Sequence, residues 1–436
     1  MDLRSINSLV NKEKYKNMKI KKLLFFVLYL ILLNGFIQTY LIKSEYIPLL
    51  SDVILFYIAF NTKNNILDVS RAVGHWVVRL FAVLVIGSTA ISIMNVIPTI
   101  SIIWGLRMVV RYLLLFMLVY KYFTKTDVDK FKRILIRFFW INTLIVAYQF
   151  FIEKKDGDFI GGIFLNNGEL FVFNLYCSLL LSKEFFIGHL SKSRFIFLLV
   201  VEMFVAMVAE IKVMYFTIPL AVYAVFIFTK KFSIKHIVVL VCAFFFLVPC
   251  MKMAMSLMYG EEYVNKTFDM EFIQEETSHM YNLSEEAADF SFNRSTCVEM
   301  ASTLILNDPI HLLFGYGVGS GNTSEKFGTW ISATYSKITS YNWFTSSWLL
   351  IEYGWVGYII WILIIFLLAH RFYYLYLKND DKVVKYWSSL GLISVFFTYI
   401  LAWYNNMPYY NAYFIYLFWA VCFVGIRERQ KELKNN

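Results

Sequence analysis

Two arginines within an apolar segment are the residues best suited to binding an anion. Arg107 and Arg111 lie four residues apart between Ile102 and Tyr120, so a helix places them on one face. A charged side chain near the centre of a membrane helix costs about 2.5–3.5 kcal/mol unless it is paired or faces water. Because a guanidinium group stays charged and binds phosphate through paired hydrogen bonds, we predict an anion site here, with phosphate as its ligand. The alternative is a structural ion pair, or side chains that extend to the membrane surface.

Three further charged residues could contribute to the same chemistry. Glu210 and Lys212 interrupt two apolar runs in V-A-E-I-K-V-M, and a tight turn between two helices needs no charges of its own. They could pair with each other or bind a ligand. Arg294 in N-R-S-T-C is surrounded by acidic residues that could simply neutralise it.

Metal and redox chemistry are not favoured. Asp156 and Asp158 form D-G-D, a pair that could hold a divalent ion on a nucleotide sugar, but the tripeptide is common. His279 and His311 lack a carboxylate at metal-like spacing. The five cysteines include no C-x-x-C pair, and the glycines from 315 to 321 lack the G-K-[ST] ending of a phosphate loop. We therefore expect no metal and no cofactor.

Composition places these residues in a membrane protein. Of the 436 residues, 59% are hydrophobic and 17% are charged, against roughly 45–50% and about 25% in a soluble domain. The apolar residues form long blocks separated by short basic stretches, which is typical of an all-α polytopic membrane protein. We expect no cleavable signal peptide, because the first block, 23–42, has spanning length and no A-x-A-like exit.

The apolar blocks predict twelve transmembrane helices with both termini in the cytoplasm. The predicted spans are 23–42, 46–60, 78–97, 101–120, 134–152, 170–187, 195–210, 213–229, 237–257, 343–368, 387–404 and 409–426. With this orientation the cytoplasmic segments hold 30 of the 41 Lys and Arg residues. The net charge of +10 is thus a topology signal directed at anionic lipid headgroups, and no nucleic-acid partner is expected.

One external segment is too long to be a simple connection. It runs from Met258 to Tyr341 and is acidic, in contrast to the cytoplasmic segments. We expect an amphipathic helix from Ser284 that ends before Asn307, followed by an irregular, turn-rich segment in F-G-Y-G-V-G-S-G. The chain accordingly divides into 1–257 with nine spans, 258–342 as the large external loop, and 343–436 with three spans and a cytoplasmic tail.

Three segments, in order, resemble the bacterial O-antigen ligase and polysaccharide polymerase superfamily. G-G-I-F-L-N-N-G-E-L-F, from Gly161, is similar to the family's G-x-F-x-N-x-N element. R-S-T-C-V-E-M-A, from Arg294, with D-P-I-H-L-L-F-G-Y-G-V-G-S resembles the arginine-bearing loop helix and the L-F-G-x-G turn. Y-N-W-F-T-S-S-W-L-L-I-E-Y-G-W-V-G, from Tyr341, looks like the H-N-x-x-L-x-x-x-x-E-x-G-x-x-G entry into the next span. The resemblance covers roughly residues 100–430.

The resemblance implies a metal-independent glycosyltransferase whose donor is an undecaprenyl-diphosphate-linked glycan. Arg294 resembles the loop arginine that faces the donor diphosphate, and Lys212 occupies the place of a basic residue that often follows the seventh span. Residues and resemblance together assign Arg294, Glu210 and Glu352 to catalysis, and Lys212, Arg107, Arg111, Asn342, Tyr341 and Asn166 to binding of diphosphate and glycan. Glu210 is the candidate general base, followed by Glu299 and His311.

Tyr341 stands where ligases typically carry a histidine proposed as the acceptor base, which favours a polymerase over a ligase. The expected activity is the joining of repeat units into O-antigen, capsule or exopolysaccharide at the outer face of the bacterial cytoplasmic membrane. A ligase, or a flippase or transporter for the same lipid-linked units, is the alternative. A chain-length regulator and a flippase of the same pathway are the candidate protein partners, and the lipid bilayer is the surrounding medium.

Overall fold

The structure of the chain is a computed structural model that describes residues 3–230, apart from 45, 63–65 and 156, and residues 294–435, apart from 295 and 325. The isolated residues 238, 249, 252, 256, 260 and 261 are also described. The described residues form helices and turns with no β-strand among them, so the predicted all-α class is confirmed for this part of the chain. The α-helices are α1 (Leu3–Phe36), α2 (Ile47–Phe60), α3 (Ile66–Val73), α4 (His75–Met94), α5 (Thr99–Tyr122), α6 (Lys125–Phe151), α7 (Asn167–Phe186), α8 (Lys192–Val208), α9 (Met214–Thr229), α13 (Cys297–Met300), α14 (Pro309–Phe314), α15 (Trp330–Thr339), α16 (Thr345–Lys378), α17 (Lys382–Tyr404), α18 (Met407–Tyr410) and α19 (Tyr413–Asn435).

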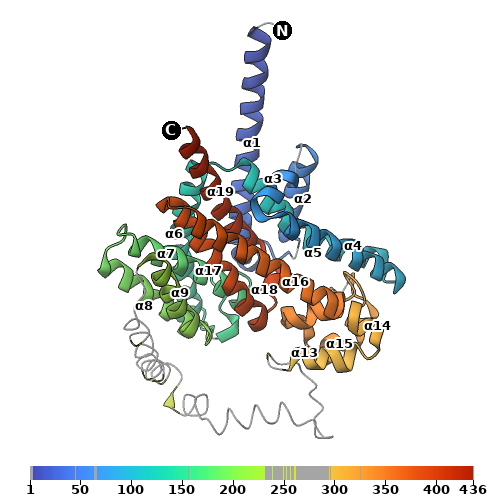
Figure 1. Ribbon diagram of the computed structural model, residues 1–436. Coiled ribbons are helices and arrows are strands. Elements are labelled where there is room, and N and C mark those ends of the chain that lie inside the picture. The colour runs from blue at the N-terminus through green and yellow to red at the C-terminus, as the bar shows by residue number, and fades with distance from the viewer. Residues whose placement is uncertain are drawn as a thin grey trace.

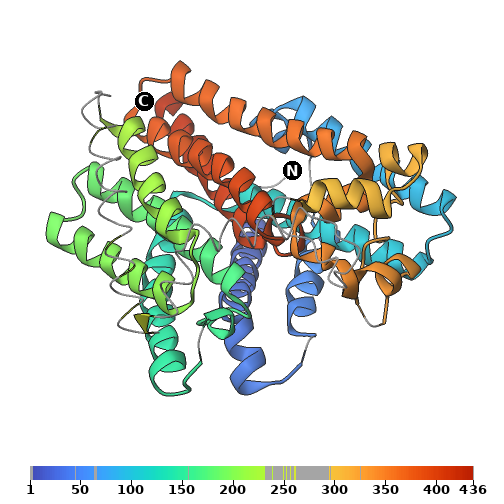
Figure 2. The ribbon, with the colours of Figure 1, turned by 90° about the horizontal axis from the view of Figure 1, so that it is seen from below.

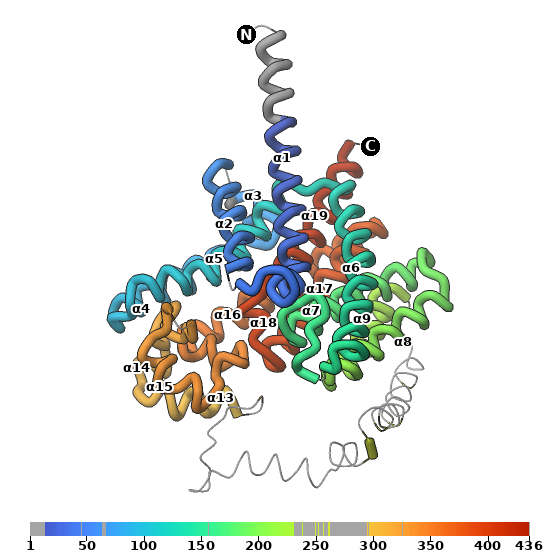
Figure 3. Tube along the Cα trace, turned by 180° about the vertical axis from the view of Figure 1, so that it is seen from behind, coloured from blue at the N-terminus to red at the C-terminus, as the bar shows by residue number. Residues whose placement is uncertain are grey.

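The helices form a bundle around α16, α17 and α19. Helices α6 to α9 lie on one side of these three and α2 to α5 on the other, as two perpendicular views show (Figures 1 and 2). Seen from behind, α1 runs between α2 and α6 and contacts α2 and α5 (Figure 3). The buried apolar side chains of these helices form one continuous core. A second, smaller core joins Cys297 of α13 to the buried side chains of Ile305, Tyr316 and Tyr341.

Among the described residues, six helices are long and apolar enough to cross a membrane, so the structure supports a membrane protein. They are Lys14–Leu41, His75–Met94, Thr99–Tyr122, Lys125–Phe151, Thr345–Lys378 and Lys382–Tyr404. Six of the twelve predicted spans fall on these helices. The predicted span 237–257 lies outside the continuously described residues. The number twelve therefore stays a prediction.

The other five predicted spans correspond to helices that either have fewer than 18 residues or are enclosed by other helices. α2 and α9 have 14 and 16 residues and are shorter than a full span. α8 has 17 residues. α7 and α19 have 20 and 23 residues and contain polar side chains, but they are enclosed by other helices. A helix surrounded by protein does not need the uniformly apolar surface that lipid requires.

The two chain ends lie at one end of the molecule, and the helices α13, α14 and α15 lie at the other (Figure 1). The N-terminal end of α1 and the C-terminal end of α19 both point away from α13, α14 and α15 (Figure 1). We therefore predict that, in a variant whose native cysteines have been replaced, Lys337→Cys on α15 reacts with a membrane-impermeant thiol reagent in intact cells. Lys382→Cys, at the first residue of α17, should react only after the membrane is opened. Both side chains are exposed, so the reverse pattern would contradict the cytoplasmic placement of the termini.

The glycine-rich segment from 315 to 321 is irregular, as predicted, and it packs into a break in α16. Gly354 has a φ of 61° and interrupts this helix. The carbonyls of Ile351 and Glu352, which the break releases, accept hydrogen bonds from the backbone N–H groups of Tyr316 and Gly317 at 2.9 Å each. Non-helical backbone at membrane depth needs such partners, because lipid offers none. The described part of the amphipathic helix, from Cys297, ends before Asn307 as expected.

The close approach of this segment to α4 requires glycine at position 317. Gly317 has a φ of 94°, and a Cβ there would lie 2.2 Å from the backbone nitrogen of Ser92. Gly317→Ala should therefore lower stability by at least about 1–3 kcal/mol, the usual cost of a residue forced into a strained backbone conformation. Thermal unfolding in detergent measures this. Gly87 lies on α4, and a Cβ there meets nothing within 4 Å. Gly87→Ala should therefore leave the midpoint of thermal unfolding unchanged or slightly raised. Equal midpoints for the two variants would contradict the packing.

Candidate functional site

Arg294 lies at the C-terminal end of α17, against Tyr404. Its guanidinium stacks over the ring of Tyr404 with the central carbon 4.3 Å from the ring centre, and its Nε donates to the Tyr404 carbonyl at 3.2 Å. The side chain is exposed. The aromatic ring and the carbonyl orient a cation that is still accessible from outside the bundle, which is the geometry needed to receive an anion.

The turn after α17 links Arg294 to the segment that begins at Tyr341. The carbonyl of Asn405 accepts from the Thr345 hydroxyl at 2.7 Å and from the Thr345 N–H at 3.1 Å. The Asn406 amide donates to the carbonyl of Asn342 at 2.7 Å. The Nδ2 of Asn405 is buried and has no hydrogen-bond partner among the described residues. A buried amide donor without a partner in a structure free of ligands is an available contact for a bound molecule.

The start of α7 reaches the same turn. Asn166 caps this helix, its Oδ1 accepting from the Glu169 N–H at 2.9 Å. A Cβ added at Gly168 would lie 3.3 Å from the Nδ2 of Asn405, so the backbone of α7 touches the turn directly. Asn411 donates to the Glu169 carboxylate at 2.8 Å. The G-G-I-F-L-N-N-G-E-L-F segment is thereby held against the residues that follow α17.

Six asparagines from three segments thus lie around the turn 404–411, whose Tyr404 contacts Arg294, and we name them the asparagine cluster. Its members are Asn166, Asn167, Asn342, Asn405, Asn406 and Asn411. An amide side chain both donates and accepts hydrogen bonds, which suits the hydroxyl groups of a sugar. The sequence interpretation named Asn166 and Asn342 but missed the other four. The only signal for Asn405, Asn406 and Asn411 is the Y-N-N-M-P-Y-Y-N run itself, which also reads as a turn.

Glu210 and Lys212 lie at the edge of this region rather than in it. Glu210 occupies the turn between α8 and α9 with a φ of 49°, and its carboxyl carbon would be 3.2 Å from a Cβ at Gly157. The next residue, Asp158, accepts a hydrogen bond from Asn167 of the asparagine cluster. Asp158 is therefore the carboxylate that touches the asparagine cluster, and Lys212, two residues after Glu210, is exposed.

Glu352 and Tyr341 lie one layer beneath the asparagine cluster. The Glu352 carboxylate is buried and accepts from the Trp348 indole at 3.0 Å, from the Gly321 N–H at 3.3 Å and from the Tyr409 hydroxyl. Tyr341 is fully buried, and its hydroxyl donates to the Gly321 carbonyl at 2.9 Å. Both residues hold the glycine-rich segment in place, and Glu352 also fixes α18, which follows Asn406.

Arg107 and Arg111 form an ion pair with one carboxylate. Asp52 on α2 lies 3.0 Å from Arg107 and 3.4 Å from Arg111, and it also accepts from the Tyr413 hydroxyl. This is the structural arrangement that the sequence interpretation kept as its alternative. It missed Asp52, although a single acidic residue in the apolar run 47–60 was the available signal.

The remaining candidates lie apart from Arg294 or outside the described residues. His311 on α14 bonds to Asp308 through Nδ1 and to Asn95 through Nε2 at 3.0 Å. The hydrogen bond from His311 lowers the pKa of the Asp308 carboxyl. Asp156 and His279 lie outside the described residues. Within the described ranges, no group of three or more His, Cys, Asp and Glu side chains could hold a metal ion.

No protein-family model matches the chain, and no curated protein matches it.

Proposed function

We propose that the chain is a polymerase that joins polyprenyl-diphosphate-linked oligosaccharide repeat units at the outer face of the bacterial cytoplasmic membrane. One observation carries this proposal. Arg294, the start of α7 and the segment from Tyr341 are far apart in sequence, and they meet around the turn 404–411 at one end of an apolar helix bundle. An enzyme for such a donor needs a cation for the diphosphate and neutral polar groups for the glycan, both next to lipid.

The reaction is a substitution at the anomeric carbon of the donor glycan. The oxygen of an acceptor hydroxyl attacks this carbon, the bond to the diphosphate oxygen breaks, and the diphosphate leaves with the bonding electrons. Arg294 stabilises the negative charge that develops on the leaving group. Asp158 or Glu210 takes the hydroxyl proton. The asparagine cluster orients the sugar rings.

A polymerase is favoured over a ligase by the position of Tyr341. The hydroxyl of this residue is buried and bonded to Gly321, so it does not reach an external acceptor as a ligase histidine would.

One observation favours a transporter as the second candidate. Broken helices are frequent in transporters, and α16 is broken at Gly354. In this chain, however, the Ile351 and Glu352 carbonyls at the break are bonded to the glycine-rich segment and are not left to coordinate an ion.

Purified protein in proteoliposomes with a synthetic lipid-linked repeat unit tests both candidates. A polymerase produces a ladder of glycans and releases polyprenyl diphosphate in proportion to the bonds formed. Movement of the lipid-linked unit between leaflets without a ladder would identify a transporter and contradict the proposal.

We also expect the ladder to form at an unchanged rate in excess EDTA. The positive charge of Arg294 takes the place that a divalent cation holds at the diphosphate in metal-dependent transferases. Gel analysis of the glycan products with and without the chelator measures this. Complete loss of product that magnesium or manganese restores would contradict the prediction and would make Asp158, with Asp156, the metal ligands.

A further inference from the structure

An apolar cavity opens on the side of the bundle toward the end that carries the chain termini. It has a volume of about 310 Å³ and lies between α3, α4, α5, α16 and α19, with Val73, Phe81, Leu113, Phe116 and Ile365 in its wall. Ile86 of α4 also lines it and is 69% exposed. Because α4, α5 and α16 are long and apolar enough to cross a membrane, we expect the open side of the cavity to face lipid.

A second cavity of opposite chemistry adjoins it. This cavity has a volume of about 260 Å³ and shares Val69 with the first. Its wall includes Arg71, Lys121 and Arg427 and a single acidic residue, Asp68. Arg71 pairs with Asp68 at 3.8 Å and Arg427 with Glu428 at 2.9 Å, so Lys121 gives the space its excess positive charge.

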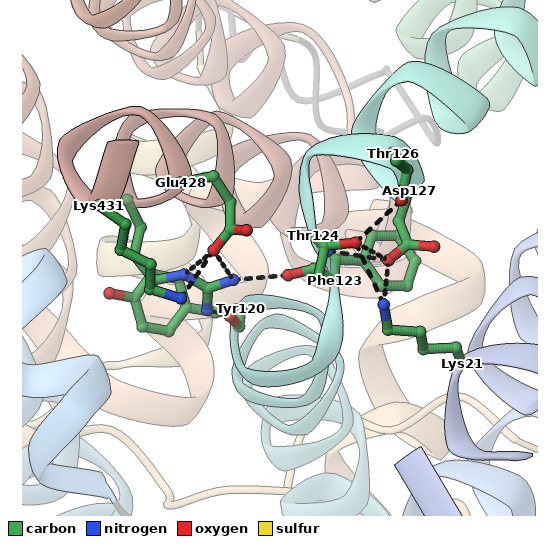
Figure 4. A network of polar contacts seen from close by, with 9 residues as sticks. Lys21, Tyr120, Phe123, Thr124, Thr126, Asp127, Glu428 and Lys431 are labelled. Atoms are coloured by element: carbon green, nitrogen blue, oxygen red, sulfur yellow. Dashed lines mark hydrogen bonds and ion pairs between the residues drawn. The ribbon is translucent and has the colours of Figure 1, made fainter. Parts of the chain in front are cut away.

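The groups around the second cavity are held by neighbouring backbone. Arg371 of α16 donates to the carbonyls of Ala72 at 2.8 Å and Arg71 at 2.9 Å, which fixes α3 over the cavity. Arg427 donates to the carbonyl of Phe123 at 2.5 Å. Tyr120 and Phe123 at the end of α5 face Glu428 and Lys431 of α19 (Figure 4). The backbone of α3 and the Arg427 side chain are therefore fixed, and Arg71 and Lys121 are exposed side chains at the edge of the cavity, with Arg71 3.8 Å from Asp68.

This pair of cavities is separate from the region around Arg294. At the external end of α5, the Ser101 hydroxyl donates to the Phe327 carbonyl at 2.9 Å. Lys121 lies twenty residues further along the same helix, or about 30 Å at 1.5 Å per residue. Basic residues dominate the segments at this end, which is the expected bias of the cytoplasmic side.

We propose that the two cavities together bind one anionic phospholipid of the cytoplasmic leaflet. An acyl chain occupies the apolar cavity, and the headgroup phosphate lies in the basic cavity beside Arg71 and Lys121. Basic pockets between transmembrane helices on the cytoplasmic side recognise anionic headgroups in this way. The site does not depend on the proposed polymerase activity, because the donor diphosphate is placed at the opposite end.

Native mass spectrometry of the full chain, delipidated and titrated with phosphatidylglycerol or phosphatidylethanolamine, tests the proposal. We expect one phosphatidylglycerol to bind in preference to phosphatidylethanolamine. The double variant Arg71→Ala with Lys121→Ala should bind it about thirtyfold more weakly, as two basic residues near an anionic headgroup imply. The matched control is Arg133→Ala with Arg137→Ala on α6, two exposed basic residues that line neither cavity. An equal loss in this control would show general surface attraction and overturn the site.

A second pair of variants tests the acyl cavity. Ala82→Trp fills it, whereas Val83→Trp places the same side chain on the next residue, which is 55% exposed and does not line the cavity. Only Ala82→Trp should reduce phosphatidylglycerol binding, by about tenfold or more. Preferential binding of undecaprenyl phosphate that Ala82→Trp blocks would show that the cavity holds the donor chain instead. If Ala82→Trp does not fold, two other results decide the proposal. They are the preference for phosphatidylglycerol over phosphatidylethanolamine and the loss of binding in Arg71→Ala with Lys121→Ala relative to its control.

Discussion

Arg294→Ala is expected to abolish visible polymer while the protein is still made and inserted. The ring and carbonyl of Tyr404 orient the guanidinium. In the proposed reaction, it stabilises the negative charge that the diphosphate gains as the glycosidic bond breaks. Loss of one preorganised contact of this kind costs about 3–4 kcal/mol in the transition state, or roughly 10²–10³ in rate. The measurement is the glycan ladder from cells or proteoliposomes at matched protein levels.

Two further variants distinguish a specific role of the Arg294 guanidinium from a general effect of positive charge. Arg294→Lys should recover only part of the rate, because the ammonium lacks the planar fork that binds two phosphate oxygens. Lys337→Ala removes an exposed positive charge from the same external segment and should leave the ladder unchanged. A normal ladder from Arg294→Ala would remove this residue from the reaction. The diphosphate contact would then pass to Lys212, since Arg107 and Arg111 already share Asp52.

The fold class could be predicted from the sequence because hydropathy and length decide it. The number of spans could not. A 14-residue helix such as α2 is apolar enough to be counted as a span, although it is too short to cross the membrane. Conversely, α7 contains the polar residues Asn174 and Lys183, and both are buried because neighbouring helices rather than lipid surround α7. Hydropathy alone does not show whether protein or lipid surrounds a helix.

The candidate site could be predicted only in part, for a related reason. The resemblance identified Arg294, Asn166 and Asn342 from motifs, and the structure places all three around the end of α17. The turn that connects them, 404–411, contains no motif. Its asparagines come close to Asn166 and Asn342 only when the chain folds. Glycine spacing correctly predicted an irregular segment from 315 to 321. Its insertion into the break of α16 depends on Gly354, which lies more than thirty residues away.

The largest effect on stability is expected for Asp52→Ala. Asp52 is 3% exposed and is the carboxylate that pairs with Arg107 and Arg111, of which Arg111 is 5% exposed. Removing one partner of a buried ion pair costs about 3–5 kcal/mol, because the remaining charge stays in the low-dielectric interior without compensation. The free energy of unfolding in mixed micelles with a denaturing detergent should fall by this amount.

A second substitution distinguishes a structural pair from an anion site at Arg107 and Arg111. Arg111→Met in the Asp52→Ala background removes one of the uncompensated charges and keeps an apolar chain of similar length, so it should restore part of the lost stability. The Arg111 guanidinium also donates to the Tyr410 carbonyl at 2.7 Å, which limits the recovery. If Asp52→Ala instead leaves stability unchanged and tightens binding of the lipid-linked donor, the two arginines form a phosphate site that Asp52 competes for. In that case, the diphosphate would lie deeper in the bundle than Arg294.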